Sequence, residues 1–255
     1  IPAFVGGFFS YAPADLHGAR GPFDCGILCH VLEHVYDLRI AVENTIRRLK
    51  TGGILYVEVP DASRYSAYHA VPFYYFDCEH INHFDEHSLN NLFSQFGCEK
   101  LAAVKKDIRA SSTNIYPVVY TIFRKTGVAC SSPVVSPDDR VRESVIAHVR
   151  RSLEASSSYR CLEEFASTRR EIVVWGAGSY TLRLLENTPL GRCNIVAFID
   201  NDTAKQGTRL RDIAIIPPGA MKGHSGPILI SSALHGEEIV KEIKNMGIGN
   251  DVIVL

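Results

Sequence analysis

Hydrophobic and polar residues follow two different periods between residues 23 and 61. The apolar run 25–32 predicts one buried strand and the turn after it. Over residues 35–49 the apolar positions recur every three or four residues, which is the pattern of one helix face. Residues 50–53, KTGG, would end that helix with a basic last turn and glycines that tolerate positive φ. The β-branched run 54–59 predicts a second strand, and strand–helix–strand is the unit of a parallel α/β sheet.

An aromatic stretch follows at 65–76, and it keeps neither a helical nor a strand period. Such an irregular segment after a strand is typical of a loop that covers a substrate. Asp85 is a good N-cap for an amphipathic helix that Gly97 would stop. Residues 99–109 and 115–124 alternate well enough to predict two strands joined by a turn.

The second half of the chain begins with a linker and a helix. Residues 126–139, TGVACSSPVVSPDD, have the composition of a linker. A helix is predicted from residue 140 to about 165, and the three serines at 156–158 weaken it enough that it could be two helices.

A second α/β unit starts near residue 170. The strand 171–175 leads into a Gly-rich turn at 176–179, and Asp200 ends the later strand 195–199. Strand, G-x-G, helix, strand and acid is the pattern of a mononucleotide-binding half. Further elements are predicted as helices at 180–187 and 237–246 and as strands at 227–231 and 252–255.

Composition narrows the function classes. The chain has 255 residues, of which 46% are hydrophobic and 22% charged, as in ordinary globular proteins with room for two domains. A formal net charge of −1 without long runs of one sign gives no support for nucleic acid or a membrane surface as a partner. No apolar run approaches the ~20 residues of a membrane helix, and no signal peptide is recognised at the start.

The seven cysteines are scattered and include no C-x-x-C pair, so structural zinc is not expected. Cys25 and Cys29 fall in or at the end of the first predicted strand and are interpreted as small buried hydrophobes. This usage of cysteine favours a reducing, cytoplasmic location.

Residues 23–61 resemble the second half of a class I S-adenosylmethionine-dependent methyltransferase. The resemblance rests on the opening Phe23-Asp24, on the turn His30-Val31-Leu32-Glu33-His34, and on the LKTGG turn at 49–53 before a strand that ends in Val59-Pro60. It implies that the loop after the fourth strand borders the methyl donor at the carboxyl ends of the parallel strands. It also implies that the strands at 99–109 and 115–124 form an antiparallel pair that ends the sheet.

Such a domain needs an earlier strand with a Gly-rich donor loop, and none is recognised before residue 23. Gly6-Gly7 is the only glycine pair there, and it lies beside Phe8-Phe9 rather than before a helix. We therefore expect the chain to be a fragment whose N-terminal part is missing.

The second α/β unit is similar to the C-terminal domain of the sugar C-methyltransferases, which act on nucleotide-linked deoxysugars. The similar parts are Gly176-Ala177-Gly178, FIDND at 198–202, KQG at 205–207 and Ile216-Pro217. Two departures are Ser179-Tyr180-Thr181, where that family often has Ala-x-Lys, and the lack of its N-terminal zinc-ribbon cysteines. The predicted fold is α/β: an incomplete class I methyltransferase sheet at 1–125, a linker and helical segment at 126–169, and a smaller Rossmann-like domain at 170–255.

The chemistry of methyl transfer needs a base and a dry pocket that holds donor and acceptor in line, but no metal. Glu79-His80 is the best candidate, because a histidine takes a proton near neutral pH and a carboxylate can orient it. In the sugar C-methyltransferases an equivalent Glu-His pair looks like the base beside a keto group, with a tyrosine two residues before the Glu. Asp77 stands at that position here, so Tyr74 or Tyr75 would have to replace the tyrosine.

Other roles for these histidines stay open. His80 could be structural and pin its loop to the sheet. His80, His83 and His87 could be read as a metal cluster, but a helix that starts at Asp85 separates them, and no metal is expected.

The resemblance also assigns contacts. Phe8, Phe9, His30, Leu32 and Glu33 would bind the cofactor, with core or helix-capping roles as the alternatives. Tyr68, Tyr75, Gly176, Gly178, Ser179 and Asp200 would bind substrate. For the glycine turn, the alternative is a vestigial nucleotide fold used for packing.

The sequence thus predicts transfer of a methyl group from S-adenosylmethionine to a small polar acceptor, with a nucleotide-linked sugar expected. A homodimer is one option for its assembly. Two rivals stay open: a nucleotide-sugar binding module without catalysis, and an NAD-dependent oxidoreductase built on the C-terminal glycines.

Overall fold

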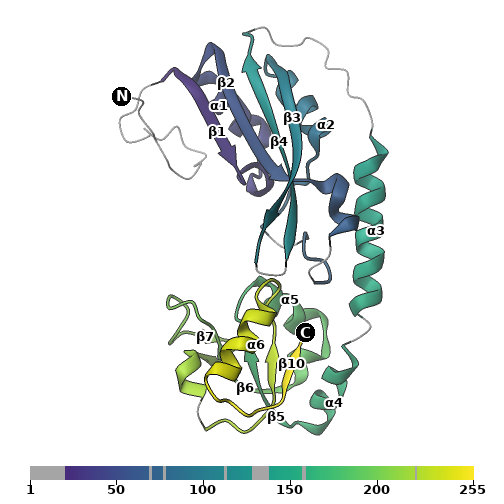
Figure 1. Ribbon diagram of the computed structural model, residues 1–255, viewed down its shortest axis with the longest axis vertical. Coiled ribbons are helices and arrows are strands. Elements are labelled where there is room, and N and C mark those ends of the chain that lie inside the picture. Colours follow the sequence, from purple (N-terminus) through teal and green to yellow (C-terminus); the bar gives the residue numbers. More distant parts are fainter. Residues whose placement is uncertain are drawn as a thin grey trace. The chain divides into compact units, whose positions relative to one another are not determined.

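The computed structural model of the protein describes residues 21–68, 71–76, 79–111, 114–127, 138–156, 159–221 and 223–255. The chain divides into two compact units. The first comprises Ile1–Tyr68, Cys78–Ile108 and Tyr116–His148, and the second comprises His69–Asp77, Arg109–Ile115 and Val149–Leu255. Each unit has its own sheet and its own core (Figure 1).

The sheet of the first unit has the order β1 (Phe23–Cys29), β2 (Leu49–Pro60), β4 (Ile115–Lys125) and β3 (Cys98–Arg109). β1 and β2 are parallel and are joined through η1 (Leu32–His34) and α1 (Leu38–Arg47), which confirms the predicted strand–helix–strand unit. β4 is antiparallel to β2, and β3 lies beyond it at the edge, so the last two strands end the sheet as expected.

Local boundaries differ from the predicted ones for identifiable reasons. The helix begins at Leu38, because the Asp37 side chain accepts the N–H of Ile40 at 2.9 Å and caps the helix there. Residues 50–53 belong to β2 rather than to a separate turn, although Gly52 has the expected positive φ of 81°.

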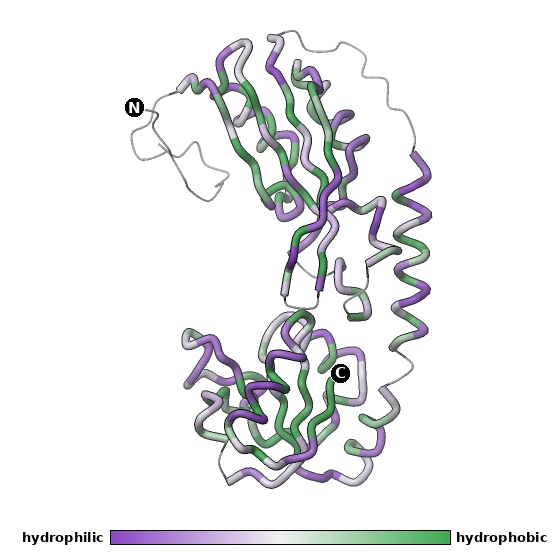
Figure 2. The backbone as a smooth tube through the Cα atoms, in the orientation of Figure 1, coloured by the Kyte–Doolittle hydropathy of each residue, from purple (hydrophilic) through white to green (hydrophobic). Residues whose placement is uncertain are grey.

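Helices α1 and α2 (Glu86–Ser94) cover one face of this sheet. Leu55, Val57 and Val59 alternate along β2 and pack in the core with residues of both helices: Val42, Ile46, Leu89 and Phe93. The neighbouring positions Tyr56 and Glu58 therefore point to the other face. Figure 2 shows the hydrophobic residues concentrated on the strands of both units.

Cys25 and Cys29 are exposed, so their interpretation as buried hydrophobes is wrong. On β1 the side chain that enters the core is Leu28, which is 4% exposed, whereas the adjacent Ile27 is 62% exposed. Cys25 and Cys29 share the uncovered face with Ile27, because side chains two residues apart lie on the same side of a strand.

The predicted cap of α2 is confirmed. The Asp85 carboxylate accepts the backbone N–H of Ser88 at 2.8 Å, and the Ser88 hydroxyl accepts the N–H of Asp85 at 2.8 Å, which completes a capping box. A short helix η2 (Ala62–Ala67) follows β2.

The second half begins with α3 (Asp139–Ser156) and α4 (Arg160–Thr168), so the serine-rich stretch does separate two helices. The sheet of the second unit has the order β10 (Val252–Val254), β9 (Ile228–Ile230), β5 (Glu171–Trp175), β6 (Asn194–Ile199), β8 (Ile213–Ile216) and β7 (Arg209–Leu210). All neighbouring pairs are parallel except the β7–β8 hairpin, which the sequence did not predict. The remaining elements are α5 (Ser179–Asn187), η3 (Pro189–Arg192), η4 (Pro218–Met221) and α6 (Gly236–Asn245).

Both faces of the second sheet are covered. Ile172 and Val174 of β5 pack with residues of α4 and α5, whereas Val173 and Trp175 pack with residues of α6. The chain adds β6 on one side of β5 and later β9 on the other, so the strand order reverses at β5. Ligands of open α/β sheets bind at such a switch point, beyond the carboxyl ends of the strands.

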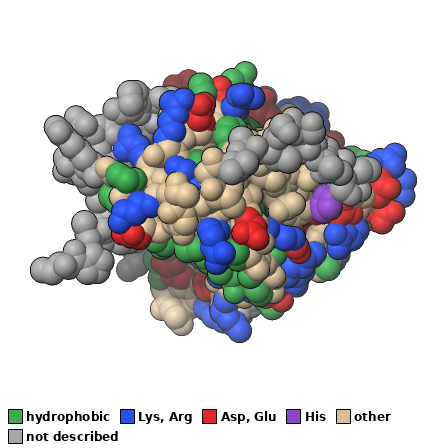
Figure 3. Space-filling view, turned by 90° about the horizontal axis from the view of Figure 1, so that it is seen from above, with side chains coloured by type: hydrophobic (Ala, Val, Ile, Leu, Met, Phe, Trp, Pro, Cys, Tyr) green, Lys and Arg blue, Asp and Glu red, His purple; other side chains and the backbone are tan. Residues whose placement is uncertain are grey.

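Charged residues of both signs are interspersed on the face drawn in Figure 3. Within the ranges that the structure describes, no helix is long and apolar enough to cross a membrane.

Candidate functional site

His30 marks the carboxyl end of β1. Its backbone has a positive φ of 52°, which residues other than glycine rarely adopt. Its N–H donates to the carbonyl of Glu58 on β2 at 2.9 Å. Unusual backbone conformations of this kind are concentrated at functional sites, so the end of β1 is a candidate functional site.

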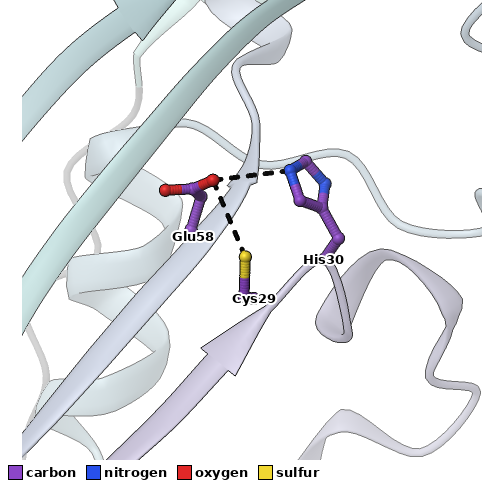
Figure 4. Close-up of side chains that lie close together, drawn as sticks. All are labelled: Cys29, His30 and Glu58. Atoms are coloured by element: carbon purple, nitrogen blue, oxygen red, sulfur yellow. Dashed lines mark hydrogen bonds and ion pairs between the residues drawn. The ribbon is translucent and has the colours of Figure 1, made fainter. Parts of the chain in front are cut away.

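Three potential ligand side chains converge there (Figure 4). The Cys29 thiol lies 3.7 Å from Glu58 Oε1, and His30 Nε2 lies 3.6 Å from the same oxygen. The other oxygen of Glu58 is bound by Lys106 Nζ at 2.7 Å and by the Tyr56 hydroxyl. One carboxylate oxygen of Glu58 is thus held by Lys106 and Tyr56, and the other faces Cys29 and His30.

Glu33 orients the imidazole of His30 from behind. Its carboxylate is 1% exposed, and Oε1 lies 2.9 Å from His30 Nδ1. This hydrogen bond is the main reason why the pKa of His30 is raised, and it outweighs the opposite effect of burial. Burial alone would raise the pKa of Glu58, but hydrogen bonds from Lys106 and Tyr56 bring it below its ordinary value. Burial, followed by the charge of Glu58, raises the pKa of the Cys29 thiol.

A second set of contacts joins the 30–34 turn to residues 79–82. The N–H groups of Ile81 and Asn82 both donate to the Glu33 carbonyl, at 2.9 and 3.1 Å. The Asn82 amide donates to the carbonyls of Leu32 at 3.1 Å and Val35 at 2.6 Å. Two segments about fifty residues apart in the sequence are therefore held side by side at the end of β1.

This contact brings the predicted base close to the predicted donor side. The His80 ring lies edge-on against the His34 ring, with centroids 4.8 Å apart, and Nδ1 of His80 is buried. His34 Nδ1 donates to the backbone carbonyl of Glu79 at 2.9 Å, whereas the residue Glu79 is itself exposed. It is therefore the imidazole of His34 that packs against His80 here.

The predicted cofactor residues lie in different environments. Phe8 and Phe9 fall outside the described residues. Leu32 is 1% exposed and belongs to the core, and the Glu33 side chain is buried against His30. Of the predicted cofactor residues that the structure describes, only His30, whose side chain is 31% exposed, offers substantial side-chain surface to a ligand.

The predicted substrate residues Tyr68 and Tyr75 also lie in different environments. The Tyr68 hydroxyl donates to Asp107 at 2.8 Å and accepts from Arg64, so it belongs to an ion-pair network at the end of η2. Tyr75 is 2% exposed and lies in the second unit, where it contacts Tyr74 edge-on at 5.2 Å.

The glycine turn of the second unit brings its predicted residues together at the switch point. Asp200 Oδ2 accepts the N–H of Ala177 at 2.9 Å and lies 3.2 Å from Lys205 Nζ. Burial alone would raise the pKa of Asp200, but hydrogen bonds from the N–H groups of Asp202 and Ala177, together with Lys205, bring it below its ordinary value. Gly176 has φ of 119°, and a Cβ there would lie 2.8 Å from the Ser231 carbonyl. Gly178 precedes α5 with open space around it, and Ser179 is exposed.

A pocket of about 580 Å³ lies elsewhere in the second unit. Its walls include Phe73, Tyr159, Tyr180 and Arg183, and none of the predicted substrate residues lines it. The Tyr159 and Tyr180 hydroxyls are 2.7 Å apart across one wall. The glycine turn, and not this pocket, is the part at the topological switch point.

Sequence reasoning missed several members of the first site. Glu58, Lys106 and Tyr56 read as ordinary alternating residues of strands, and only pairing between distant strands brings them to His30. His34 was part of the quoted 30–34 turn without an assigned role, and Asn82 was not singled out. His80, His83 and His87, the grouping for which no metal was expected, do not form such a cluster: among the described residues, the groups that could hold a metal are Cys29–His30–Glu58 and Glu33–His34–His80.

Comparisons with known proteins address the first unit most directly. Residues 7–103 match the family model described as a methyltransferase domain, and residues 168–254 match the one described as C2185-like, N-terminal. The search of curated proteins gave no match.

A solved structure titled as a SAM-dependent methyltransferase from Methanosarcina mazei is 19% identical, with a TM-score of 0.34. The likeness covers 42% of this chain and 60% of that protein, which is too slight to argue from. The family match bears out the prediction of a methyltransferase domain, with S-adenosylmethionine as the donor that such a domain implies.

Proposed function

We propose that the protein transfers a methyl group from S-adenosylmethionine to a small polar acceptor, with a nucleotide-linked sugar as the acceptor class. The observation that carries the proposal is the link between the 30–34 turn and residues 79–82, which holds His80 beside the end of β1. Residues 7–103 match a methyltransferase domain, which implies S-adenosylmethionine as the methyl donor.

The site fits the donor through His30 and the backbone of the 30–34 turn. His30 is partly exposed and fixed in orientation by Glu33, so it can line a donor without reorganising. Leu32 and Glu33 would support that surface from the core rather than touch the donor. When bound, the donor supplies an electrophilic methyl group on a sulfonium, which leaves as a neutral thioether.

His80 is assigned the role of base. It accepts the proton from the acceptor atom as that atom becomes the nucleophile. The edge-on His34 ring fixes its plane, and the hydrogen bond from His34 to the Glu79 carbonyl fixes His34 in turn. Glu79 acts mainly through this backbone carbonyl, and its exposed side chain is expected to contribute less than the sequence suggested.

In the second unit, Gly178, Ser179 and the first turn of α5 are assigned to binding the phosphate of a nucleotide. The N-terminus of a helix favours phosphate, and the space at Gly178 is open. Asp200 already accepts the N–H of Ala177, so its assigned role is to hold the turn in shape and not to bind a ribose hydroxyl. Gly176 serves packing against Ser231.

Calorimetric titration with S-adenosylmethionine tests the donor, and transfer of a labelled methyl group to a panel of nucleotide-linked sugars tests the reaction. His80→Gln should lower kcat by about 10²–10⁴-fold while the donor Kd stays unchanged. The matched control is His235→Gln, an exposed histidine paired with Glu238 on α6, which should leave kcat unaltered. Folded protein that binds no donor would overturn the proposal, and equal activity of the His80 variant would remove the base assignment.

A further inference from the structure

We infer that Cys29, His30 and Glu58 form a binding site for a divalent transition-metal cation of the zinc type. The three residues offer one sulfur, one nitrogen and one oxygen, and these atoms all lie within 4.8 Å of one another. Thiolate, imidazole and carboxylate are the donors that zinc takes from proteins. The inference goes beyond the proposed function and does not rest on it.

The separations between the ligand atoms are near those of atoms that share one bound ion. Two donors bound to one tetrahedral zinc lie roughly 3.3–3.6 Å apart, given metal–ligand bonds of about 2.0–2.3 Å. The separations from Glu58 Oε1 are 3.7 Å to the Cys29 sulfur and 3.6 Å to His30 Nε2. A nitrogen–oxygen separation of 3.6 Å is too long for a hydrogen bond. The three ligand atoms all lie within 4.8 Å of one another, so they would have to draw closer together to coordinate one ion.

Glu33 gives the site the support that metal-binding histidines usually have. Its carboxylate lies 2.9 Å from His30 Nδ1, which leaves Nε2 to face Glu58. A histidine that ligates a metal characteristically gives its other ring nitrogen to a carboxylate or carbonyl in this way. His30 Nε2 is buried, forms no hydrogen bond with the described residues and lies 3.6 Å from Glu58 Oε1.

The surrounding charges can be balanced by a divalent ion. The Cys29 thiolate and the carboxylates of Glu33 and Glu58 carry three negative formal charges. Lys106 brings one positive charge and holds the outer oxygen of Glu58 at 2.7 Å, away from the proposed ion. A divalent cation supplies the other two. Three protein ligands leave a fourth position open for water or another oxygen, and the exposed Cys29 gives access.

The rival account is a protonated His30 that bridges two carboxylates with no ion. Titrating the full chain, reduced and stripped of metal with a chelator, with Co²⁺ alone separates the two. Binding at the proposed site should produce a thiolate-to-cobalt charge-transfer band that saturates near one equivalent and disappears when Zn²⁺ is added. The band should be lost in Cys29→Ser and kept in Cys25→Ser, an exposed cysteine on the same strand.

Two further variants sharpen the test. Glu33→Gln should weaken Co²⁺ binding about 10–100-fold, because it removes the group that orients His30. His30→Asn should also weaken binding, and asparagine tolerates the positive φ of that position. No band, a band that survives Cys29→Ser, or a band lost equally in Cys25→Ser would overturn the inference. Circular dichroism of the Cys29→Ser and Cys25→Ser pair checks that both variants fold. Because the readout is an absorption band, failure of methyl transfer would not affect it.

Discussion

A single amide side chain, that of Asn82, does much to hold the candidate base in place. It donates to the carbonyls of Leu32 and Val35, and both of those residues belong to the segment on the donor side. Asn82→Ala leaves both carbonyls short of a donor and should cost about 1–3 kcal/mol of local stability. Hydrogen exchange measures this directly, and the amides of Ile81 and Asn82 should exchange faster, because they bond to Glu33 in the same connection.

Asn250 is the matched control for this prediction. Its side chain also donates to two carbonyls, those of His224 at 2.9 Å and Gly226 at 2.6 Å, but it does so in the second unit. Asn250→Ala should leave exchange at residues 81 and 82 unchanged. Unaltered protection there in Asn82→Ala would mean that the loop is held by its backbone hydrogen bonds alone.

Asp200 predicts a pH dependence for the second unit. Its pKa is lowered by the Asp202 and Ala177 N–H groups and by Lys205, despite burial, so its ionised form is favoured in the folded state. Stability from such a group is present above the ordinary aspartate pKa of 3.8 and is lost as the pH falls through the lower folded value. Asp200→Asn should therefore destabilise the unit at about pH 6 and progressively less at about pH 3.

Urea unfolding at the two pH values, followed by the fluorescence of Trp175, measures this difference. Asp212→Asn provides the comparison, since Asp212 is exposed in the β7–β8 turn. A destabilisation by Asp200→Asn that is the same at both pH values would show that the carboxylate acts through shape and not through charge.

Residue-level prediction from the sequence succeeded where the signal was local. The cap at Asp85 is such a case, because the capping residue and the N–H groups that it binds lie within one turn. The environment of His30 is the opposite case. Its partners Glu58 and Lys106 reach it through pairing of β1 with β2 and of β4 with both of its neighbours, and no local period records those registers.

At the scale of elements, the turn after β5 allows the roles of its two glycines to be separated. Gly176 has φ of 119°, and a Cβ there would lie 2.8 Å from the Ser231 carbonyl, whereas Gly178 has neither a positive φ nor a close neighbour. Gly176→Ala should cost about 2 kcal/mol or more through backbone strain and displacement of β9, and Gly178→Ala should be nearly neutral.

The urea midpoints of these two variants test the assignment. If Gly178→Ala keeps the stability but weakens binding of uridine or thymidine diphosphate, then Gly178 serves the ligand and Gly176 serves the fold. Equal destabilisation by both variants would contradict the geometry of the turn.

The β7–β8 hairpin shows why some elements could not be predicted. Its two turn residues, Arg211 and Asp212, both have positive φ, of 48° and 64°. Tight hairpin turns with two such residues usually carry Asn-Gly or Asp-Gly, and the sequence Arg-Asp gives no such signal. The parallel strands were easier to recognise, because burial on both faces makes β5 and β6 continuous apolar runs.

For the whole molecule, the separate cores make unfolding of the two units distinguishable. The single tryptophan, Trp175, is 1% exposed in the core of the second unit, so its fluorescence reports on that unit. Val57 lies in the core of the first unit and Val174 in a core of the second, and both are 0% exposed. Truncating either valine to alanine should cost about 2 kcal/mol through lost burial and the cavity left behind.

The two variants should then respond differently to urea. Val174→Ala should lower the midpoint of the Trp175 fluorescence transition, whereas Val57→Ala should leave that midpoint unchanged and lower only the transition seen by circular dichroism. This outcome is expected because no residue of the first core belongs to the cores around Trp175. A fluorescence midpoint that shifts equally in both variants would mean that the units unfold as one cooperative body, and stability changes in either unit would then have to be read as changes in both.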